Sequence, residues 1–379
     1  MKQYPLCGFA AVIITPPGQT DLAGYDTGST RLATGVHDEL EAMILILQTQ
    51  SDLILIIQLD LLAIDDGVTQ QIRAIAESLS IQSNNVFVCA THTHSGPTGT
   101  LQEDFVAGYH NVKVTGRYDP HLVGYMIRSI ESGIHHAYNH REQAVIRYGF
   151  NQVTSVASNR NDASIECDQT LLAIEISLVG GSKILVYNYG CHPTVLSARN
   201  SLYTSDWLLG VKKQASKDGY DMTVFLNGSS ADISTRYTRI ESTFKEADRL
   251  GALVYQHIRE ALQYTEILLT QEHVTYSKQH NMKLKDTHES VDISIPILRL
   301  DDLYFLFIPA ELCSTLSLPI RNKYGQKVIF CTLSNNCYAY IADQKAYENQ
   351  WYEALASPFA MGEGEKLMEM IDGYIKEII

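Results

Sequence analysis

Residues 86–97 read VFVCATHTHSGP, and this stretch decides how the fold and the chemistry of the chain are interpreted. The apolar run Val86–Cys89 predicts a buried strand, and the Ser-Gly-Pro at the end of the stretch predicts a turn. Alternate residues of an extended chain point to the same side, so we expect His92 and His94 to face one small volume. Two imidazoles in that position indicate a metal site. The competing interpretation is that they only cap the strand by hydrogen bonds, because two ligands do not complete a site.

Histidine and glutamate follow two later strands in the same way. The strand predicted over Lys183–Tyr189 leads into a Gly-Cys-His-Pro turn, which places His192 just past the strand end. The strand predicted over Leu303–Pro309 leads to Glu311 between apolar neighbours. Burying a lone carboxylate costs free energy, so a bound cation is one reason for Glu311; a helix N-terminus, whose dipole favours a carboxylate, is the other. With His92 these residues form the two-histidine, one-glutamate set of catalytic zinc sites, which leaves a position open for water.

Strands and helices alternate along the rest of the chain. Apolar and alternating runs predict strands at 9–15, 42–48, 53–62, 86–89, 144–148, 169–178, 183–189, 222–226, 303–309 and 327–333, and the polar stretch 266–300 also reads as strand. Helical spacing predicts helices at 66–79, 120–136, 242–264, 313–324 and 363–379. The chain has no repeat or Gly/Ser linker, and a boundary near residue 266 is only weakly signalled. We therefore expect an α/β fold: a single large domain, residues 1–379, with mixed β-sheets flanked by helices and the metal site at strand ends.

The composition excludes several classes of partner. The net charge is −14 and no run is rich in Lys or Arg, which argues against nucleic acid and anionic membrane, because both require a basic face. The longest apolar stretch, residues 53–64, is too short for an integral membrane segment. The N-terminus reads as a strand rather than a secretion signal, and the seven cysteines form no CxxC pair, as expected of reduced core cysteines. We expect a cytoplasmic protein that acts on small molecules, with a homo-oligomer left open.

Ten further blocks accompany ATHTHSGP, and together they resemble the catalytic domain of one family. In chain order they are GFAAVIITPPG, LAGY, TGVHDELEAMIL, LDLLAID, ASNRN, DQTLLAIE, NYGCHPT, FLNGSSADIS, IPAEL and YAYIADQKAYENQWYEA. The family is that of the neutral, non-lysosomal ceramidases, zinc amidases that cleave ceramide into sphingosine and a fatty acid. ATHTHSGP is the specific block, and the others are individually weak but occur in the family's order.

The resemblance implies two sets of site residues. The implied zinc ligands are His92, His192, Glu311 and Tyr340. The residues with implied active-site roles are His94, Arg160, Ser234 and Tyr352. The implied reaction is cleavage of an amide bond by metal-activated water.

Chemical reasoning suggests a role for three of these residues. His94 is too close to His92 to bind the same ion with ideal geometry, so we expect it to be a proton donor or oxyanion stabiliser. Arg160 is expected to anchor a polar or anionic part of the substrate. Ser234 is assigned substrate binding first and covalent attack second, because a serine nucleophile requires a base beside it.

Three departures from the family pattern bear on the substrate. The block from Ala231 replaces a GDVSPN-like sequence and brings Arg236 close to the pocket. The segment Gln271–Val291, expected to supply the walls for acyl chains, is short and polar. We also expect the catalytic domain alone, without the family's C-terminal β-sandwich or a signal peptide. These features predict a small-molecule amide substrate, smaller and more polar than ceramide. The alternatives are a zinc hydrolase of an ester or cyclic amide, and an inactive binding protein, which the presence of all four implied ligands disfavours.

Overall fold

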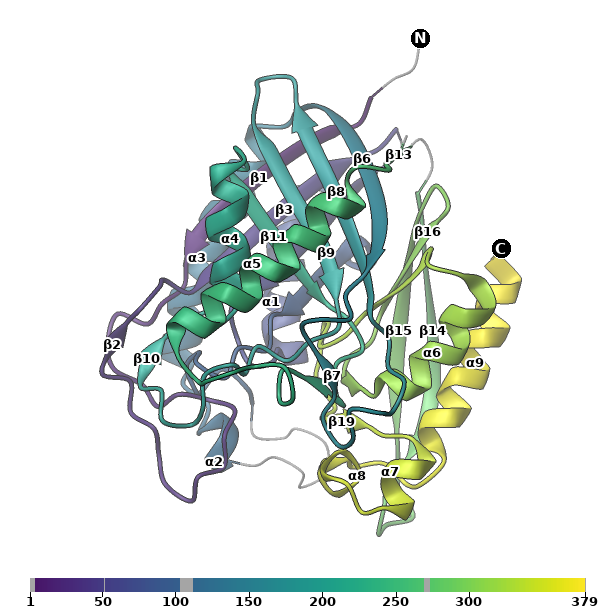
Figure 1. Ribbon diagram of the computed structural model, residues 1–379. Helices are drawn as coiled ribbons and strands as arrows, with labels where there is room; N and C mark the ends of the chain where they lie inside the picture. The colour runs from purple at the N-terminus through teal and green to yellow at the C-terminus, as the bar shows by residue number, and fades with distance from the viewer. Residues whose placement is uncertain (1–3, 51, 103–111, 269–272, 379) are drawn as a thin grey trace.

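A nine-stranded mixed sheet forms the centre of the structure (Figure 1). The structure is a computed structural model that describes residues 4–50, 52–102, 112–268 and 273–378. The strand order is β11 (Met222–Asn227), β9 (Lys183–Tyr189), β8 (Thr170–Leu178), β6 (Glu142–Gln152), β1 (Leu6–Ile13), β3 (Glu41–Gln48), β4 (Leu53–Leu59) and β5 (Val86–Ala90), with β13 (Glu266–Leu268) pairing with β6. Only the two outermost pairs, β11 with β9 and β4 with β5, are parallel. Both parallel pairs therefore lie at the ends of the sheet, and they carry the histidine loops.

The two halves of this sheet face each other, with helices on both outer sides. One apolar cluster joins strands of both halves, including Leu45 from β3 and Val224 from β11. Helices α1 (Asp66–Ser78) and α3 (Pro120–Asn139) cover the outer face of the first half, and α4 (Leu208–Lys217) and α5 (Phe244–Ala261) cover that of the second. Neighbouring residues of a strand point to opposite faces, so Ile44 packs under the first helix pair while Leu45 lies between the halves. Burial on both faces explains why these strands read as continuous apolar runs.

A smaller sheet with its own helices packs against the first. It has the order β14 (His273–Lys283), β15 (Ser290–Leu300), β16 (Leu303–Phe307) and β18 (Val328–Cys331). Helices α6 (Ser314–Tyr324) and α9 (Glu363–Ile378) cover its outer face, as Figure 1 shows. The rings of Phe87 in β5 and Phe307 in β16 stack at 4.1 Å between centroids. This contact ties the smaller sheet to the strand that leads to the first histidines.

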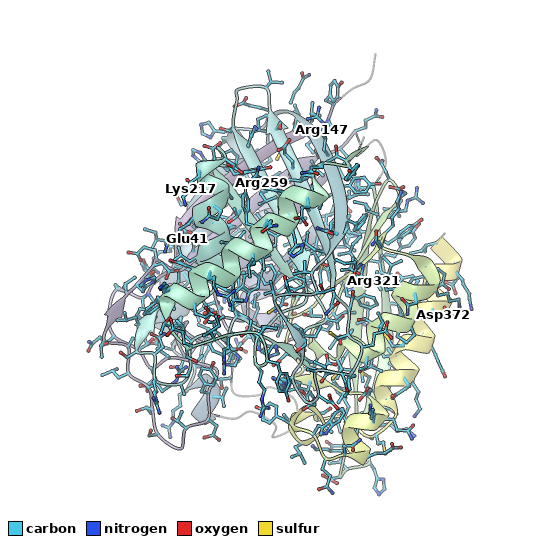
Figure 2. The ribbon with its side chains drawn as sticks, in the orientation of Figure 1. Glu41, Arg147, Lys217, Arg259, Arg321 and Asp372 are labelled. Atoms are coloured by element: carbon cyan, nitrogen blue, oxygen red, sulfur yellow. The ribbon has the colours of Figure 1, made fainter. Side chains whose placement is uncertain are left out.

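Short elements complete the structure. They are the strand pairs β2 (Gly35–Val36) with β10 (Leu202–Tyr203), β7 (Ser158–Asn159) with β12 (Ile233–Ser234) and β17 (Glu311–Leu312) with β19 (Tyr340–Ile341), the 3₁₀ turn η1 (Ser83–Asn85), and the helices α2 (Val112–Thr115), α7 (Gln344–Glu348) and α8 (Tyr352–Ala356). Charged side chains such as Lys217 and Arg259 lie on the exposed side of α4 and α5 (Figure 2). Within the described residues, no helix is both long enough and apolar enough to cross a membrane.

The predicted fold class, α/β with mixed sheets flanked by helices, is confirmed, and several boundaries need correction. Helix α3 continues to Asn139 instead of ending near residue 136, because its buried face extends through Ala137. Helix α4 was not predicted, and neither were α7 and α8. Helices of one turn, such as α7 and α8, are too short to display a period. The polar stretch 266–300 contains the long hairpin β14–β15, and residues 269–272 within it lie outside the described part of the chain.

Candidate metal centre and active site

Two histidines from the loop after β5 meet in one volume, although not by the route expected from the sequence. The strand ends at Ala90, and His92 has a φ of +69°, so the segment is not extended as we assumed. Backbone hydrogen bonds from Thr91 to Leu59 and from His92 to Leu61 hold the loop in this conformation. The rings of His92 and His94 still lie edge to face with centroids 4.9 Å apart, and their Nε2 atoms are 3.4 Å apart. The prediction of a shared volume therefore holds, and its geometric reason was wrong.

Backbone carbonyls orient the histidines proposed as metal ligands. His92 Nδ1 lies 2.7 Å from the carbonyl oxygen of Leu62, and His192 Nδ1 lies 2.8 Å from that of Ser230. A carbonyl oxygen can only accept, so each Nδ1 carries the hydrogen and each Nε2 has a free lone pair. Metal-binding histidines commonly have such a partner, which sets the tautomer and the direction of the ring.

Three acceptor atoms converge on one point. Glu311 Oε2 lies 3.2 Å from His92 Nε2 and 3.2 Å from His192 Nε2. The Nε2 atom of His192 and Oε2 of Glu311 are buried and have no hydrogen-bond partner. Lone pairs that face one another in a buried site repel, and a cation between them removes both the repulsion and the cost of the missing hydrogen bonds.

The spacing of these atoms suits zinc. Ligands at about 2.0–2.1 Å from a tetrahedral zinc ion are separated from one another by about 3.4 Å. The separations of 3.2 Å from Glu311 to His92 and to His192, and of 3.4 Å from His92 to His94, are all close to this value. Among the described residues, the ligand atoms of His92, His94 and His192 also lie within 4.8 Å of one another. The residues present therefore fit the ion that the sequence suggested.

His94 differs from the other two histidines in what surrounds it. We excluded His94 as a ligand because of its closeness to His92. That reason was wrong, since the 3.4 Å between their Nε2 atoms is compatible with two ligands of one ion. The Nδ1 atom of His94, however, is buried and has no hydrogen-bond partner, so no carbonyl sets its tautomer. Its ring packs edge-on against Tyr25, with centroids 4.7 Å apart, and directly against Gly24. His94 is held by packing and by the contact of its Nε2 with His92 Nε2, and its Nδ1 has no hydrogen-bond partner.

Burial and neighbouring charges set the protonation of the site. Burial lowers the pKa of His94 well below its usual value, and the nearby His92 and His192 lower it further. Burial likewise lowers the pKa of His192. For Glu311 burial acts in the opposite direction, but the adjacent His92 and His192 hold its pKa well below the usual range. Neutral imidazoles beside an ionised carboxylate are the forms that bind a divalent cation.

Tyr340 lies beside Glu311 because β17 and β19 pair in parallel register with these two residues as partners. Burial raises the pKa of Tyr340 well above its usual value, and the adjacent Glu311, to which its hydroxyl is hydrogen-bonded, raises it further. The ring of Tyr352 packs edge to face on that of Tyr340, with centroids 5.5 Å apart. The two tyrosines, which are 12 positions apart in the sequence, therefore form one wall of the site.

Arg160 completes the group. Its Nε donates to Glu353 Oε1 at 2.6 Å, while its Nη2 is buried without a partner. The guanidinium carbon lies 5.6 Å and 5.3 Å from the ring centroids of Tyr340 and Tyr352. Burial disfavours the charged guanidinium, but Tyr340, Glu353 and Glu311 more than offset this and raise the pKa of Arg160.

A cavity of about 690 Å³ opens onto these groups. Its lining includes six of the eight predicted site residues, namely His92, His94, Arg160, Glu311, Tyr340 and Tyr352. The remaining wall is largely apolar or backbone, with Leu62, Ala63, Leu101, Val114, Cys337 and Ala356. Sequence reasoning assigned no role to Tyr25, which also lines the cavity, or to Glu353, although both occur in blocks that resembled the family.

Three residues expected at the pocket lie outside its lining, namely His192, Ser234 and Arg236. Ser234 is 8% exposed, and its Oγ accepts a hydrogen bond from the Arg236 backbone at 3.3 Å. Arg236 itself is exposed, and neither residue lines the cavity. The adjacent Ile233 carbonyl lies 3.1 Å from His192 Nδ1, so this segment supports a proposed ligand from behind.

The polar segment Gln271–Val291 does not line the cavity either. Its first two residues lie outside the described part of the chain, and none of the others contributes to the wall. Instead its turn contacts the α8 segment: Lys285 Nζ donates to the carbonyl oxygen of Leu355 at 2.9 Å, and Leu284 forms a bridge with Phe359. The polarity of this segment therefore gives no information about the substrate, and our use of it for that purpose was wrong.

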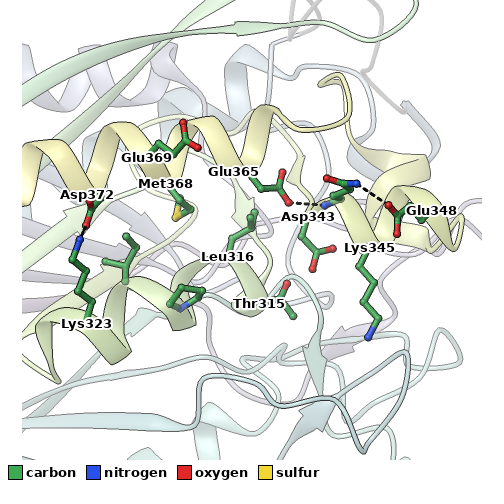
Figure 3. Close-up of a pocket in the computed structure, with 13 residues that line it drawn as sticks. Thr315, Leu316, Lys323, Asp343, Lys345, Glu348, Glu365, Met368, Glu369 and Asp372 are labelled. Atoms are coloured by element: carbon green, nitrogen blue, oxygen red, sulfur yellow. Dashed lines mark hydrogen bonds and ion pairs between the residues drawn. The ribbon is translucent and has the colours of Figure 1, made fainter.

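A second hollow, between α6, α7 and α9, lacks the features of a metal site (Figure 3). Its floor includes Leu316 and Met368, and no histidine or cysteine lines it. Several of its carboxylates are bonded to neighbours, as when Glu365 accepts from the Gln344 backbone at 2.7 Å. None of the predicted site residues lies there.

Comparison with known proteins assigns the family. A family model described as neutral/alkaline non-lysosomal ceramidase, N-terminal, matches residues 6–208, which is more than half of the chain. The crystal structure of neutral ceramidase from Pseudomonas aeruginosa superposes with a TM-score of 0.84 at 16% identity and covers 97% of this chain and 73% of that one. A structure titled "Ceramidase complexed with C2" gives a TM-score of 0.83 at 15% identity, covering 99% and 76%. No curated protein sequence matches. The matched region includes His92, His94, Arg160 and His192, and on this basis the chain belongs to the neutral/alkaline non-lysosomal ceramidase family.

Proposed function

We propose that this protein is a zinc-dependent amidohydrolase that cleaves the N-acyl bond of a small-molecule amide, within one catalytic domain spanning residues 1–379. The observation that carries the proposal is the convergence of three buried acceptors, in which Glu311 Oε2 lies 3.2 Å from both His92 Nε2 and His192 Nε2, beside a cavity large enough for a small molecule. Family membership supports a hydrolase that acts on amide bonds.

His92, His192 and Glu311 would hold the ion, with Tyr340 as a fourth ligand through its hydroxyl. Bound zinc lowers the pKa of water to about 7 and polarises a carbonyl group, which are the two needs of amide hydrolysis. The carbonyl oxygens of Leu62 and Ser230 keep the two histidines in the tautomer that this role requires.

The other residues act on the substrate. His94 is neutral and partly buried, so it can accept a proton from the attacking water and deliver one to the leaving nitrogen. Arg160 offers its unpaired Nη2 to a substrate oxygen, and Tyr352 packs beside it. Water is the proposed nucleophile, rather than Ser234, because Ser234 does not line the cavity. The role left for Ser234 is to support the loop behind His192.

We propose a substrate that is smaller and more polar than long-chain ceramide. The support is now the cavity itself: about 690 Å³ with an unpaired guanidinium nitrogen and two histidines in its wall. Sites of about 300–1,000 Å³ accommodate ligands of drug-like size. Esters and cyclic amides remain alternative substrates, because the same activated water attacks either carbonyl group.

Metal analysis and a substrate panel test the proposal. Wild-type protein should contain close to one zinc ion per chain, and His92→Ala should lose it. His136→Ala, which changes an exposed histidine on α3, is the matched control and should keep the ion. The panel compares N-acetyl amino acids, N-acetyl amino sugars, short-chain and long-chain ceramide, and the matching esters. Absence of zinc or of amide cleavage would refute the function, and the highest kcat/KM on long-chain ceramide would refute only the polar substrate.

A further inference from the structure

Glu353 is a fully buried carboxylate that adjoins the cavity wall without lining it. It lies on α8 directly after Tyr352 and is 0% exposed. Its Oε1 accepts a hydrogen bond from Arg160 Nε at 2.6 Å, and its Oε2 accepts one from Asn161 Nδ2 at 3.1 Å. Both oxygens are thus bonded to one short segment, so this carboxylate fixes the segment that carries Arg160.

The guanidinium of Arg160 is bound through Nε and has no partner at Nη2. The backbone N–H of Arg160 donates to the carbonyl oxygen of Asp232 at 2.7 Å, and its Nε is bound by Glu353. Its side chain is only 18% exposed, yet Nη2 is buried with no partner in a residue that lines the cavity. A buried charged donor without an acceptor is costly, so such an atom indicates where a ligand atom binds.

We propose that Glu353 is a positioning residue that holds Arg160 so that Nη2 faces the cavity, where it binds an anionic or carbonyl oxygen of the substrate. The identity of that oxygen as part of an amide substrate rests on the function proposed above. The rings of Tyr340 and Tyr352 flank the guanidinium and leave it little freedom once Nε is held. Glu353 does not itself line the cavity, so it acts through Arg160.

Two substitutions separate position from charge. Glu353→Gln keeps the length of the side chain and an acceptor for Arg160 Nε, but removes the negative charge. Glu353→Asp keeps the charge but is one methylene too short to reach both donors. A residue that only neutralises a buried arginine would tolerate Asp better than Gln, whereas a positioning residue would tolerate Gln better than Asp.

Binding of inorganic phosphate, measured by calorimetry at equal zinc content, provides a readout that does not require catalysis. We expect Arg160→Ala and Glu353→Asp to weaken phosphate binding by about 10-fold or more, as for loss of a hydrogen bond to a charged group. Glu353→Gln should remain much closer to wild type. Asp168→Asn is the matched control, because Asp168 forms another buried pair, with Arg321 at 2.7 Å, and does not line the cavity. It should lower stability without changing phosphate binding.

On the best amide of the panel, KM should be highest for Glu353→Asp, lower for Glu353→Gln and lowest for wild type. A purely structural role would lower Tm and leave KM unchanged. If Glu353→Asp does not fold, Asn161→Ala replaces it, since it removes the second donor to the same carboxylate; its phosphate binding should also weaken. Phosphate binding by Glu353→Asp or Asn161→Ala that equals wild type would overturn the proposal, as would a wild-type protein that binds no phosphate. Lack of zinc or of amidase activity would refute the proposed function alone, because the order of phosphate affinities is measured independently.

Discussion

Gly24 lies next to His94. A methyl group added at Gly24 should displace the His94 ring without removing it, and so test whether the position of the ring matters for activity. Gly24 has a φ of +99°, and a Cβ atom added there would lie 2.4 Å from His94 Cγ and 2.5 Å from His94 Nδ1. Ordinary contact begins at 3.4 Å, so in Gly24→Ala the imidazole must move by about 1 Å, the difference between 3.4 Å and 2.4 Å. The ring has no hydrogen bond on Nδ1 to resist that movement.

The magnitude follows from two separate contributions. An L-residue at positive φ costs about 1–2 kcal/mol of stability. A displacement of about 1 Å in a catalytic group lowers the rate by about 10²-fold. We therefore expect Gly24→Ala to be folded and slightly less stable, with kcat/KM reduced by about 10²-fold. Zinc content should be unchanged, because the three atoms nearest the added Cβ all belong to His94 and none to the proposed ligands.

Gly28 supplies the matched control in the same loop. Its φ is +73°, but nothing lies within 4 Å of a Cβ added there. Gly28→Ala therefore carries the backbone strain without the clash, and it should keep wild-type activity. The assay is kcat/KM on the best amide of the panel, with Tm and zinc content measured on both variants. Equal activity of Gly24→Ala and Gly28→Ala would refute the reasoning, because the position of His94 would then be unimportant for the reaction.

Three further predictions concern His94 itself, the cysteines and Asp60. His94→Ala should keep zinc and lose about 10²-fold or more in activity, as for removal of an acid/base group, whereas loss of zinc in metal analysis would make His94 a ligand. The seven cysteines are all free and buried, and burial raises the pKa of the cavity-lining Cys337 to about 12, so a thiol reagent at pH 8 should label the native protein far more slowly than the protein in denaturant; equal labelling rates would contradict this packing. Burial raises the pKa of Asp60 to about 7, so the folded state binds a proton there more tightly than the unfolded state between about pH 4 and pH 7. Wild type should therefore gain stability relative to Asp60→Asn as the pH falls from 8 to 5, and urea unfolding of both proteins at the two pH values gives the difference.

The order and type of the main elements could be predicted from the sequence, because the way each element is buried determines its pattern of apolar residues. Strands such as β3 and β4 lie between two apolar layers and therefore read as long apolar runs. Longer helices such as α5 show a 3.6-residue period because only one side packs inward. Elements of a single turn, such as α8, are too short to show an apolar period. Helix α8 carries both Tyr352 and Glu353.

For the candidate site, the sequence determined which residue types stand at strand ends, and tertiary structure decided what they do together. The positions of His92, His192 and Glu311 just after apolar runs were visible because those runs are local patterns. The convergence of Glu311 Oε2 on both histidines at 3.2 Å depends on the packing of the smaller sheet on the larger one, which no local pattern records.

The same physical reason explains the errors and omissions. The family resemblance led us to expect the polar segment Gln271–Val291 at the pocket wall, but packing turns it toward α8 instead. Nothing in the local sequence distinguishes Glu353 from a glutamate that faces water. Only the folded chain shows it to be fully buried and bonded to Arg160, 193 residues away. Burial and partners at long sequence separation are properties of the fold, and here they decide which charged groups serve the site.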